Sequence, residues 1–302
     1  MNNRNFLFFI NPVSGTGNKA ALVEFIETSM RARQLKFAIA YTNARADYSH
    51  LPGKITDEQI TDLVICGGDG SINQIGNYLV GNNVRIGIIP RGSGNGLAFS
   101  LGIPKNKEKA LKIILDGYAA RIDALQINNR FSCMLCGLGF DAKVAHAFAK
   151  ASSRGLKTYT RLTLSNWIFA KSYRFSIYSE GQLLLTEAYF INIANANQFG
   201  NNIRIAPKAS LSDGKLDIII VNKMNRVRLL GHVMRQLIAG NPVSIKEAKH
   251  KKKAVQYIQA SALKIVNDSM APLHIDGEPA DTAKEFDIRI IPLALNLLQP
   301  GN

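Results

Sequence analysis

The sequence predicts two domains, an N-terminal α/β domain built on a parallel sheet and a mostly β C-terminal domain. Three observations support this prediction. The chain has 302 residues, which at ~100–200 residues per domain suits one large domain or two ordinary ones. Predicted strands alternate with predicted helices at the start of the chain. After about residue 120 this rhythm gives way to short alternating segments.

Apolar runs define the first half. They predict strands at residues 6–10, 36–41, 63–66 and 85–89. Apolar side chains recur at helical spacing over residues 21–30, and a second helix is expected at about residues 71–79. Strands that alternate with helices require crossover connections, so we expect a parallel sheet.

The second half is typical of antiparallel strands. Alternating patterns predict strands at residues 124–127, 130–135, 174–178, 182–194, 216–221 and 285–291. Residues 142–170 and 226–237 are predicted to be helical. We therefore place the first domain at residues 1–121 and the second at residues 122–287.

Three glycine-rich loops follow predicted strands, at residues 11–17, 67–70 and 90–95. The carboxyl ends of parallel strands lie along one edge of a sheet, so these loops should converge. Glycine lets the backbone approach a ligand closely, and successive N–H groups can form an anion-binding nest. Helices after Gly17 and Gly70 add their N-terminal dipoles. The pattern predicts a triphosphate cradle.

An acid, Asp69, stands between glycines in the second loop. Phosphate binding alone does not explain a carboxylate there, whereas Mg²⁺ between the two does, because Mg²⁺ binds carboxylate and phosphate oxygens. The sequence has no GxxxxGK[ST] motif, and GxGxxG is absent after the first strand. These absences disfavour a P-loop and a dinucleotide-binding Rossmann fold.

The net charge of +15 is concentrated in two segments. Residues 143–174 contain seven Lys or Arg and no acid, and residues 223–254 contain nine and one acid. Such a localised basic field predicts a polyanionic partner, which leaves nucleic acid, anionic membrane and phosphorylated substrates open.

Cys133 and Cys136 form a CxxC pair, but no further ligands stand at a spacing that would complete a metal site. We expect buried strand thiols, reduced in a cytoplasmic setting. We also expect neither a signal peptide nor a membrane-spanning segment.

Several motifs together resemble the diacylglycerol kinase catalytic family, which includes bacterial lipid kinases, sphingosine kinases and ceramide kinases. They are Asn11-Pro-Val-Ser-Gly15, Gly67-Gly-Asp-Gly-Ser71 with Asn73, Arg91-Gly-Ser-Gly-Asn-Gly-Leu-Ala98, Gly137-Leu-Gly-Phe-Asp-Ala142, Ser212-Asp-Gly-Lys-Leu-Asp217 and His274-Ile-Asp-Gly-Glu-Pro279. The resemblance covers nearly the whole chain. It implies an NAD kinase-like first domain, a β-sandwich second domain that helps to bind lipid, and a return of residues 288–302 to the first domain.

The resemblance also implies ATP as phosphoryl donor, with Mg²⁺. The implied nucleotide-binding residues are Asn11, Ser14, Gly15, Thr16, Thr42, Gly67, Gly68, Gly70, Ser71, Asn73, Gly92, Ser93, Gly94 and Asn95. Two departures matter. Ala46-Asp-Tyr48 replaces a frequent Gly-His-Ala, and the third loop is closer to sphingosine kinases than to diacylglycerol kinases, which puts diacylglycerol in doubt as acceptor.

Glu278 and Asp69 are the candidate catalytic residues. By itself an Asp-Gly turn followed by an acid is common on protein surfaces. In bacterial relatives, however, the residue that matches Glu278 is proposed to accept the acceptor hydroxyl's proton, while in sphingosine kinases the residue that matches Asp69 has that role. The roles of the two stay unassigned here.

The resemblance further implies a structural Mg²⁺ held by Asp213 and the carbonyls of Ser210 and Lys215. Asp141 is a candidate contact for the lipid head group or ATP, with a structural role as the alternative.

We expect an ATP-dependent lipid kinase that acts on a sphingoid base, diacylglycerol or related lipid. It should contact the anionic cytoplasmic membrane face peripherally and bind no nucleic acid; a homodimer is left open. NAD kinase is the enzymatic alternative, because it shares Gly-Gly-Asp-Gly. A basic nucleic-acid-binding module, based on Lys249-His-Lys-Lys-Lys253, is the non-enzymatic one.

Overall fold

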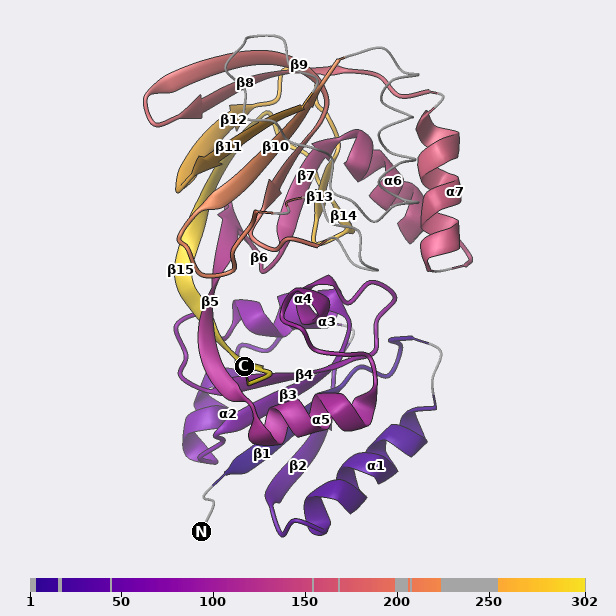
Figure 1. Ribbon diagram of the computed structural model, residues 1–302, viewed down its shortest axis with the longest axis vertical. Coiled ribbons are helices and arrows are strands. Elements are labelled where there is room, and N and C mark those ends of the chain that lie inside the picture. The colour runs from indigo at the N-terminus through magenta and orange to yellow at the C-terminus, as the bar shows by residue number, and fades with distance from the viewer. Residues whose placement is uncertain are drawn as a thin grey trace. The chain divides into compact units, whose positions relative to one another are not determined.

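A computed structural model of the chain describes residues 4–15, 18–43, 45–153, 155–167, 169–198, 206, 208–223 and 255–301. The chain forms two compact units (Figure 1), Met1–Ile122 with Leu293–Asn302, and Asp123–Pro292. The first is α/β and the second is mostly β, so the predicted fold class is confirmed. The helix predicted at residues 226–237 lies outside the described residues.

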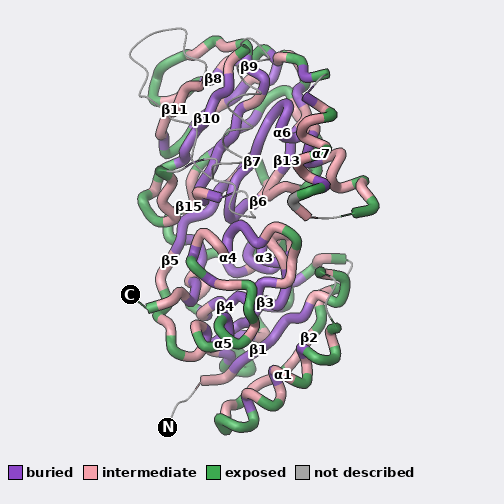
Figure 2. The backbone as a smooth tube through the Cα atoms, turned by 45° about the vertical axis from the view of Figure 1, so that its right-hand side comes forward, coloured by how far each residue is buried: buried purple, intermediate pink, exposed green. Residues whose placement is uncertain are grey.

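The first unit is built on a parallel sheet. Its strands lie in the order β15–β4–β3–β1–β2, and each neighbouring pair is parallel. The bounds are β1 Asn5–Ile10, β2 Lys36–Tyr41, β3 Asp62–Gly67, β4 Arg85–Pro90 and β15 Glu285–Gln299. Figure 2 shows β1, β3 and β4 buried along most of their length, as their continuous apolar runs predict.

The helices of this unit are α1 Lys19–Arg31, α2 Leu51–Asp57, α3 Asp69–Asn77, α4 Gly96–Ser100 and α5 Lys107–Asp116. Asn18 caps α1 by accepting the backbone N–H groups of Ala20 and Ala21. Our prediction missed α2, α4 and α5. The signals for α5 were present, because Asn106 caps it and Ala110, Leu111 and Ile114 are buried at helical spacing.

Asp62 is fully buried at the amino end of β3 and is held by two arginines. Arg4 Nη2 donates to its Oδ1 at 2.6 Å, and Arg85 Nη2 donates to its Oδ2 at 2.7 Å. Arg4 Nε also donates to Oδ2 at 3.0 Å, and Thr61 Oγ1 donates to the same oxygen at 2.7 Å. The carboxylate therefore ties the starts of β1, β3 and β4 together.

The Asp62→Asn substitution should lower the free energy of unfolding by about 3 kcal/mol, because it leaves two guanidinium groups facing a neutral amide. Urea denaturation measures this loss. The matched control is Asp116→Asn, which breaks an exposed pair with Lys112 and should cost less than about 0.5 kcal/mol. Similar losses for both variants would contradict the prediction.

The second unit consists mainly of antiparallel strands. Its main sheet runs β14–β13–β7–β9–β8–β12–β15, with β10 on β9, β11 on β10, β5 on β15 and β6 on β5. The bounds are β5 Tyr118–Ile127, β6 Arg130–Ser132, β7 Leu135–Gly139, β8 Tyr173–Ser179, β9 Gln182–Ala194, β10 Leu216–Asn222, β11 Val255–Ala260, β12 Ala262–Val266, β13 Leu273–Ile275 and β14 Glu278–Ala280. An apolar core that includes Phe175, Ile193, Ile218 and Phe286 holds these strands together.

Four predicted elements of this unit differ in extent, and β11, β12 and β14 were not predicted. The strands expected at residues 124–127 and 285–291 are the longer β5 and β15. The helix expected at residues 142–170 is two helices, α6 Phe140–Ala149 and α7 Leu156–Trp167. Gly155 between them has a φ of +100°, which glycine adopts without strain. The strand expected at residues 130–135 bends between β6 and β7, because backbone N–H groups at the bend donate to Asp276.

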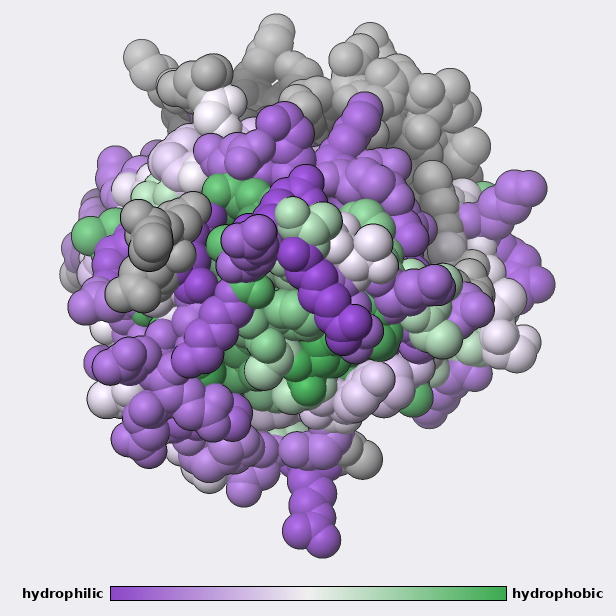
Figure 3. Space-filling view, turned by 90° about the horizontal axis from the view of Figure 1, so that it is seen from below, coloured by the Kyte–Doolittle hydropathy of each residue, from purple (hydrophilic) through white to green (hydrophobic). Residues whose placement is uncertain are grey.

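No helix among the described residues is both long and apolar enough to cross a lipid bilayer. In a space-filling view (Figure 3), apolar side chains gather at the centre of one face and hydrophilic side chains surround them.

Candidate active site

The three glycine-rich loops of the first unit meet. Asn11 Nδ2 in the first loop donates to Ser71 Oγ after the second loop at 2.8 Å. An added Cβ on Gly68 would lie 2.8 Å from the Cα of Gly92 in the third loop, and one on Gly15 would lie 2.3 Å from the Arg91 carbonyl oxygen. Both are below any ordinary van der Waals contact, so only glycine fits.

Asp69 connects the second loop to the third. It is the first residue of α3, and its carboxylate accepts the backbone N–H groups of Gly96 at 3.0 Å and Leu97 at 3.2 Å. These two N–H groups open α4. A negative charge at a helix N-terminus is favourable, so Asp69 fixes the geometry of two loops at once.

Asn95 shapes the third loop from within. Its backbone is left-handed with a φ of +53°, and its side chain is buried. The side chain accepts the Gly92 N–H at 2.7 Å and donates to the Gly92 carbonyl at 2.8 Å. Ser93, at the tip of this loop, is exposed. The loop thus presents its serine and glycines outward on a fixed turn.

Two cations that the motif analysis missed face this loop cluster. Lys19 Nζ donates to the Ser14 carbonyl oxygen. Partial burial lowers the pKa of Lys19, and the positive charge of Arg91 lowers it further. Two like charges repel each other, so an anion bound among the loops would relieve that repulsion. Arg91 was visible in the third motif and Lys19 at the start of α1.

Thr42 lies beside the first loop, because its backbone N–H donates to the Ile10 carbonyl at 3.0 Å. Tyr48, which departs from the family pattern, is buried and packs edge-on against Phe9 and Tyr78. Its hydroxyl accepts the Asn43 N–H at 3.4 Å. Tyr48, although it differs from the family pattern, therefore supports the loop that carries Thr42. Thr16 lies outside the described residues.

Glu278 begins β14 and is exposed. It follows a two-residue hairpin of Asp276 and Gly277, whose φ values of +50° and +84° fit a type I′ turn. The Asp276 carboxylate is partly buried and hydrogen-bonded to the protein, unlike the solvated acid expected of a plain surface turn. It accepts Ser132 Oγ at 2.6 Å and the N–H groups of Cys133, Met134 and Leu135.

Asp141, in the first turn of α6, is 6% exposed. Its Oδ2 lies 3.3 Å from His274 Nε2, and Asn192 Nδ2 donates to the same oxygen at 3.4 Å. His274, in β13, is fully buried.

The loop at residues 210–215 precedes β10. The Lys215 N–H donates to Asp213 Oδ1 at 3.1 Å, and the Gly214 N–H donates to Asp123 Oδ2 at 2.7 Å. Asp217 Oδ2 is buried with no hydrogen-bond partner among the described residues. Burial, opposed in part by a hydrogen bond from Gln259 and aided by the charge of Asp213, raises the pKa of Asp217 to about 6.

The loop at residues 210–215 contains the predicted Mg²⁺ donors. Within the described residues no three His, Cys, Asp or Glu side chains gather as a metal cluster. The predicted donors are one carboxylate and two backbone carbonyls, a set that Mg²⁺ can complete with water. A cation here would also favour the charged form of Asp217. The residues therefore fit the ion.

Cys66, Cys133 and Cys136 are all buried, as expected, and form no disulfide with one another. Cys136 lies in β7 as expected, whereas Cys133 lies at the bend between β6 and β7 and not in a strand. Burial raises the pKa of Cys66 to about 12. Burial and then the charges of Asp276 and Asp141 raise the pKa of Cys136 further above its usual range. Protonated, enclosed thiols are poor metal ligands.

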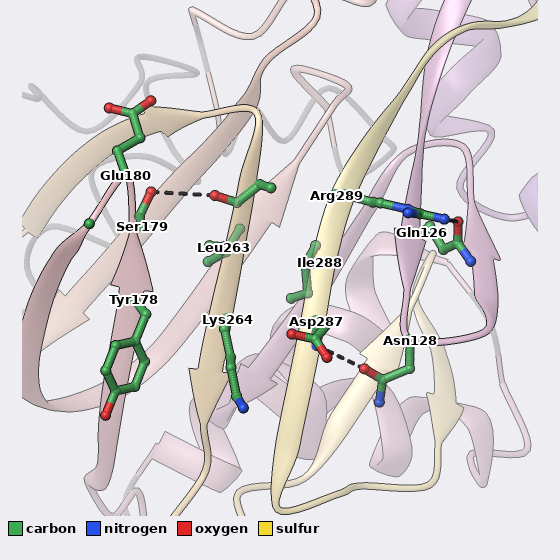
Figure 4. Close-up of a pocket in the computed structure, with 12 residues that line it drawn as sticks. Gln126, Asn128, Tyr178, Ser179, Glu180, Leu263, Lys264, Asp287, Ile288 and Arg289 are labelled. Atoms are coloured by element: carbon green, nitrogen blue, oxygen red, sulfur yellow. Dashed lines mark hydrogen bonds between the residues drawn. The ribbon is translucent and has the colours of Figure 1, made fainter.

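The second unit also has an open cavity of about 670 Å³ on the outer face of β8, β12 and β15. Several polar residues that line this cavity are hydrogen-bonded to one another (Figure 4). Arg289 donates to Gln126, and the Asp287 N–H donates to Asn128. None of the predicted site residues lines it, so we do not assign the lipid to it.

Comparison with known proteins decides the family. Residues 5–127 match the model of the diacylglycerol kinase catalytic domain, and residues 135–299 match the YegS C-terminal NAD kinase beta sandwich-like domain. The chain belongs to the diacylglycerol kinase catalytic family. It is an enzyme of the lipid kinase class, a phosphotransferase.

Several relatives illustrate the match. A protein of Chromohalobacter salexigens named as a YegS-like lipid kinase is 26% identical, over 94% of this chain and 91% of its own. A diacylglycerol kinase of Staphylococcus carnosus is 24% identical, over 89% of this chain and 86% of the length of that kinase. A crystal structure from Bacillus anthracis strain Sterne, described as a diacylglycerol kinase, is 19% identical and superimposes with a TM-score of 0.75 over 98% of this chain and 97% of its own. That last likeness concerns the fold.

Within this diacylglycerol kinase family chain, the structure gathers the predicted loop residues of the first unit and the pair Asp141 and His274 of the second. Asp69 and Glu278 belong to different units. The structure also adds Lys19, Arg91 and His274 to the residues that the sequence analysis named as site candidates.

Proposed function

We propose that this protein is an ATP-dependent lipid kinase that transfers the γ-phosphoryl group of ATP to a lipid hydroxyl. The acceptor is a sphingoid base, diacylglycerol or a related lipid. One observation carries the proposal: three glycine loops meet beside two mutually repelling cations, Lys19 and Arg91. This arrangement suits a polyphosphate, because backbone N–H groups and cations both stabilise its negative charge.

The residues of the first unit would bind and orient the nucleotide. The loops that carry Ser14, Gly15, Gly68 and Ser93 supply backbone donors to the phosphates, while Thr42 lies beside them. Mg²⁺, when bound, would neutralise charge that develops on the transferred phosphoryl group. Asp69 would hold that ion near the phosphates.

Glu278 of the second unit would accept the proton of the lipid hydroxyl. A lipid alcohol is a weak nucleophile until its proton has an acceptor, and an exposed carboxylate on a fixed hairpin provides one. The Asp69 carboxylate already accepts hydrogen bonds from two backbone N–H groups. We therefore assign the base to Glu278 and the metal–phosphate role to Asp69.

Incubation with γ-labelled ATP and mixed lipids should give a labelled chloroform-soluble product. Lack of product across sphingoid bases, diacylglycerols, ceramides and polyprenols would refute the proposal. A coupled assay for NADP⁺ tests the NAD kinase alternative in the same preparation and should stay at background.

Mg²⁺ should stabilise the protein through the loop at residues 210–215. Millimolar Mg²⁺ should raise the midpoint of thermal unfolding by a few degrees, of order RT ln(1 + [L]/Kd) in free energy. The Asp213→Ala variant should lose this gain, whereas Asp281→Ala, an exposed acid in the same unit, should keep it. An equal gain in both variants would place the ion elsewhere.

We also propose that the second unit docks on an anionic membrane surface at the cytoplasmic face. The solvent side of α7 carries Lys157 and Arg161, one turn apart, and Phe169 beyond its end is 79% exposed. Aromatic contacts of Phe148 with Tyr159 and of Phe140 with Trp167 hold α7 on α6. Trp167 is thus a packing residue, while Phe169 is available to a membrane. The basic segment at residues 223–254 lies, apart from Lys223, outside the described residues.

The double substitution Lys157→Gln, Arg161→Gln should weaken binding to phosphatidylserine-containing vesicles, because each basic residue near such a surface contributes about 1 kcal/mol. A loss of about tenfold or more in the vesicle partition coefficient is expected. Activity on detergent-dispersed lipid should be unchanged. Lys36→Gln on the first unit is the control for a change in net charge. Equal losses in vesicle and detergent assays, or retention on a DNA column at physiological salt, would contradict membrane docking.

A further inference from the structure

One cross-strand row of the second unit contains the buried His274. In the register of β13, β7 and β9, His274 lies opposite Gly137, and Gly137 lies opposite Asn192. Directly paired residues point to the same face of a sheet. The row therefore presents an imidazole and an amide on one face, with an empty position between them.

The carboxylate of Asp141, at the start of α6, fills the space over Gly137 in this row. A Cβ on Gly137 would lie 2.0 Å from Asp141 Oδ2 and 2.4 Å from His274 Nε2. Glycine is thus required for the carboxylate and the imidazole to meet. With Asp141 and His274 at 6% and 0% exposure, this is an enclosed polar contact rather than a surface one.

The hydrogen bonds assign the imidazole tautomer. The Gly277 N–H donates to His274 Nδ1 at 3.3 Å, so Nδ1 carries no proton. Nε2 then holds the proton and faces Asp141 Oδ2 at 3.3 Å. A neutral imidazole with this tautomer links the buried carboxylate to the backbone of the Asp276–Gly277 turn.

We propose that His274, oriented by Asp141, is a positioning residue that sets the placement of Glu278 through the Gly277 N–H. The turn is fixed on its other side by the Asp276 carboxylate in the β6–β7 bend. The buried His274 and the partly buried Asp276 thus hold the two residues that precede Glu278. This inference rests on the proposed role of Glu278 as the proton acceptor.

Two near-isosteric variants separate the two contacts of His274. In His274→Gln the amide nitrogen can still donate to Asp141, but the acceptor for Gly277 is lost. In His274→Asn the amide oxygen stands near the place of Nδ1 and can still accept the Gly277 N–H. His146→Gln is the matched control, because His146 contacts the Leu273 carbonyl of the same strand without touching the turn.

We expect His274→Gln to lower kcat about tenfold, with KM for ATP changed by less than about twofold. His274→Asn should stay within about threefold of wild type, and His146→Gln should be unchanged. In a Glu278→Gln background, His274→Gln should have no further effect, because the group it positions is gone. A merely structural role would give the same tenfold loss in both backgrounds.

The outcomes separate this inference from the proposed function. If Glu278→Gln lowers kcat and His274→Gln does not, or if their effects multiply, the positioning role is wrong while the base assignment stands. If Glu278→Gln is fully active, both are wrong. ¹⁵N NMR of the wild-type imidazole needs no variant and should show the Nε2–H tautomer; an Nδ1–H tautomer would overturn the inference even if the His274 variants fail to fold.

Discussion

Replacing Asp69 by Asn should lower kcat by about 10²- to 10³-fold, the loss typical of removing one preorganised electrostatic contact from an active site. The carboxylate of Asp69 accepts two N–H groups of α4, one on each oxygen. An amide can accept only one of them and turns its own NH₂ toward the other. The variant also loses the negative charge that we propose holds Mg²⁺ near the phosphates.

The two roles of Asp69 can be separated. Phosphoryl transfer should be measured at increasing Mg²⁺, alongside thermal unfolding with and without ATP. We expect the variant to need more Mg²⁺ for half-maximal rate, with a modest drop in unfolding midpoint. Asp57→Asn, an exposed acid at the end of α2, is the control and should be unaffected. A variant with lower thermal stability but normal kcat would show that Asp69 serves only the loops.

The Glu278→Gln variant should lower kcat by about 10²- to 10³-fold, within the range known for loss of a positioned proton acceptor. Gln keeps the size of the side chain and cannot take the proton. Because Glu278 is exposed on an edge strand, the unfolding midpoint should stay near that of wild type. Single-turnover phosphoryl transfer to the lipid measures the chemical step directly.

Glu285→Gln provides the matched control for Glu278→Gln. Glu285 is an exposed glutamate of the same unit that pairs with Lys264 at 2.8 Å, and hydrogen bonding with that lysine lowers its pKa. Its substitution should leave kcat unchanged. If Glu278→Gln behaves like Glu285→Gln, Glu278 is not the proton acceptor.

The convergence of the glycine loops could be predicted because it follows from strand direction alone. Apolar runs of β-branched residues followed by glycines locate strand ends, and parallel strands bring such ends to one edge. The contacts inside the cluster could not be predicted. Gly68 approaches Gly92 closely, and the first N–H groups of α4 donate to Asp69. These contacts join segments that are far apart in the chain, and no repeating pattern in the sequence predicts which residues will meet.

The cations of the cluster show the same division. Arg91 stood within a motif, yet its charge became informative only when Lys19 was found close enough to lower that lysine's pKa. Likewise the Asp276–Gly277 dipeptide predicts a turn, but a solvated surface turn and a turn anchored by hydrogen bonds to its carboxylate have the same local sequence. The donors that distinguish them come from Ser132 and the β6–β7 bend.

By itself the sequence determined the fold class, the carboxyl ends of β1, β3 and β4 and the family motifs, because these depend on patterns within about ten residues of chain. Tertiary structure decided the bend at Cys133 and Met134 and the burial of His274. Both arise from partners more than a hundred residues away, Asp276 for the bend and Gly137 with Asp141 for the imidazole. A polar side chain that is removed from water must find its hydrogen-bond donors and acceptors within the protein, and these partners set its role. Only the folded chain brings the partners together.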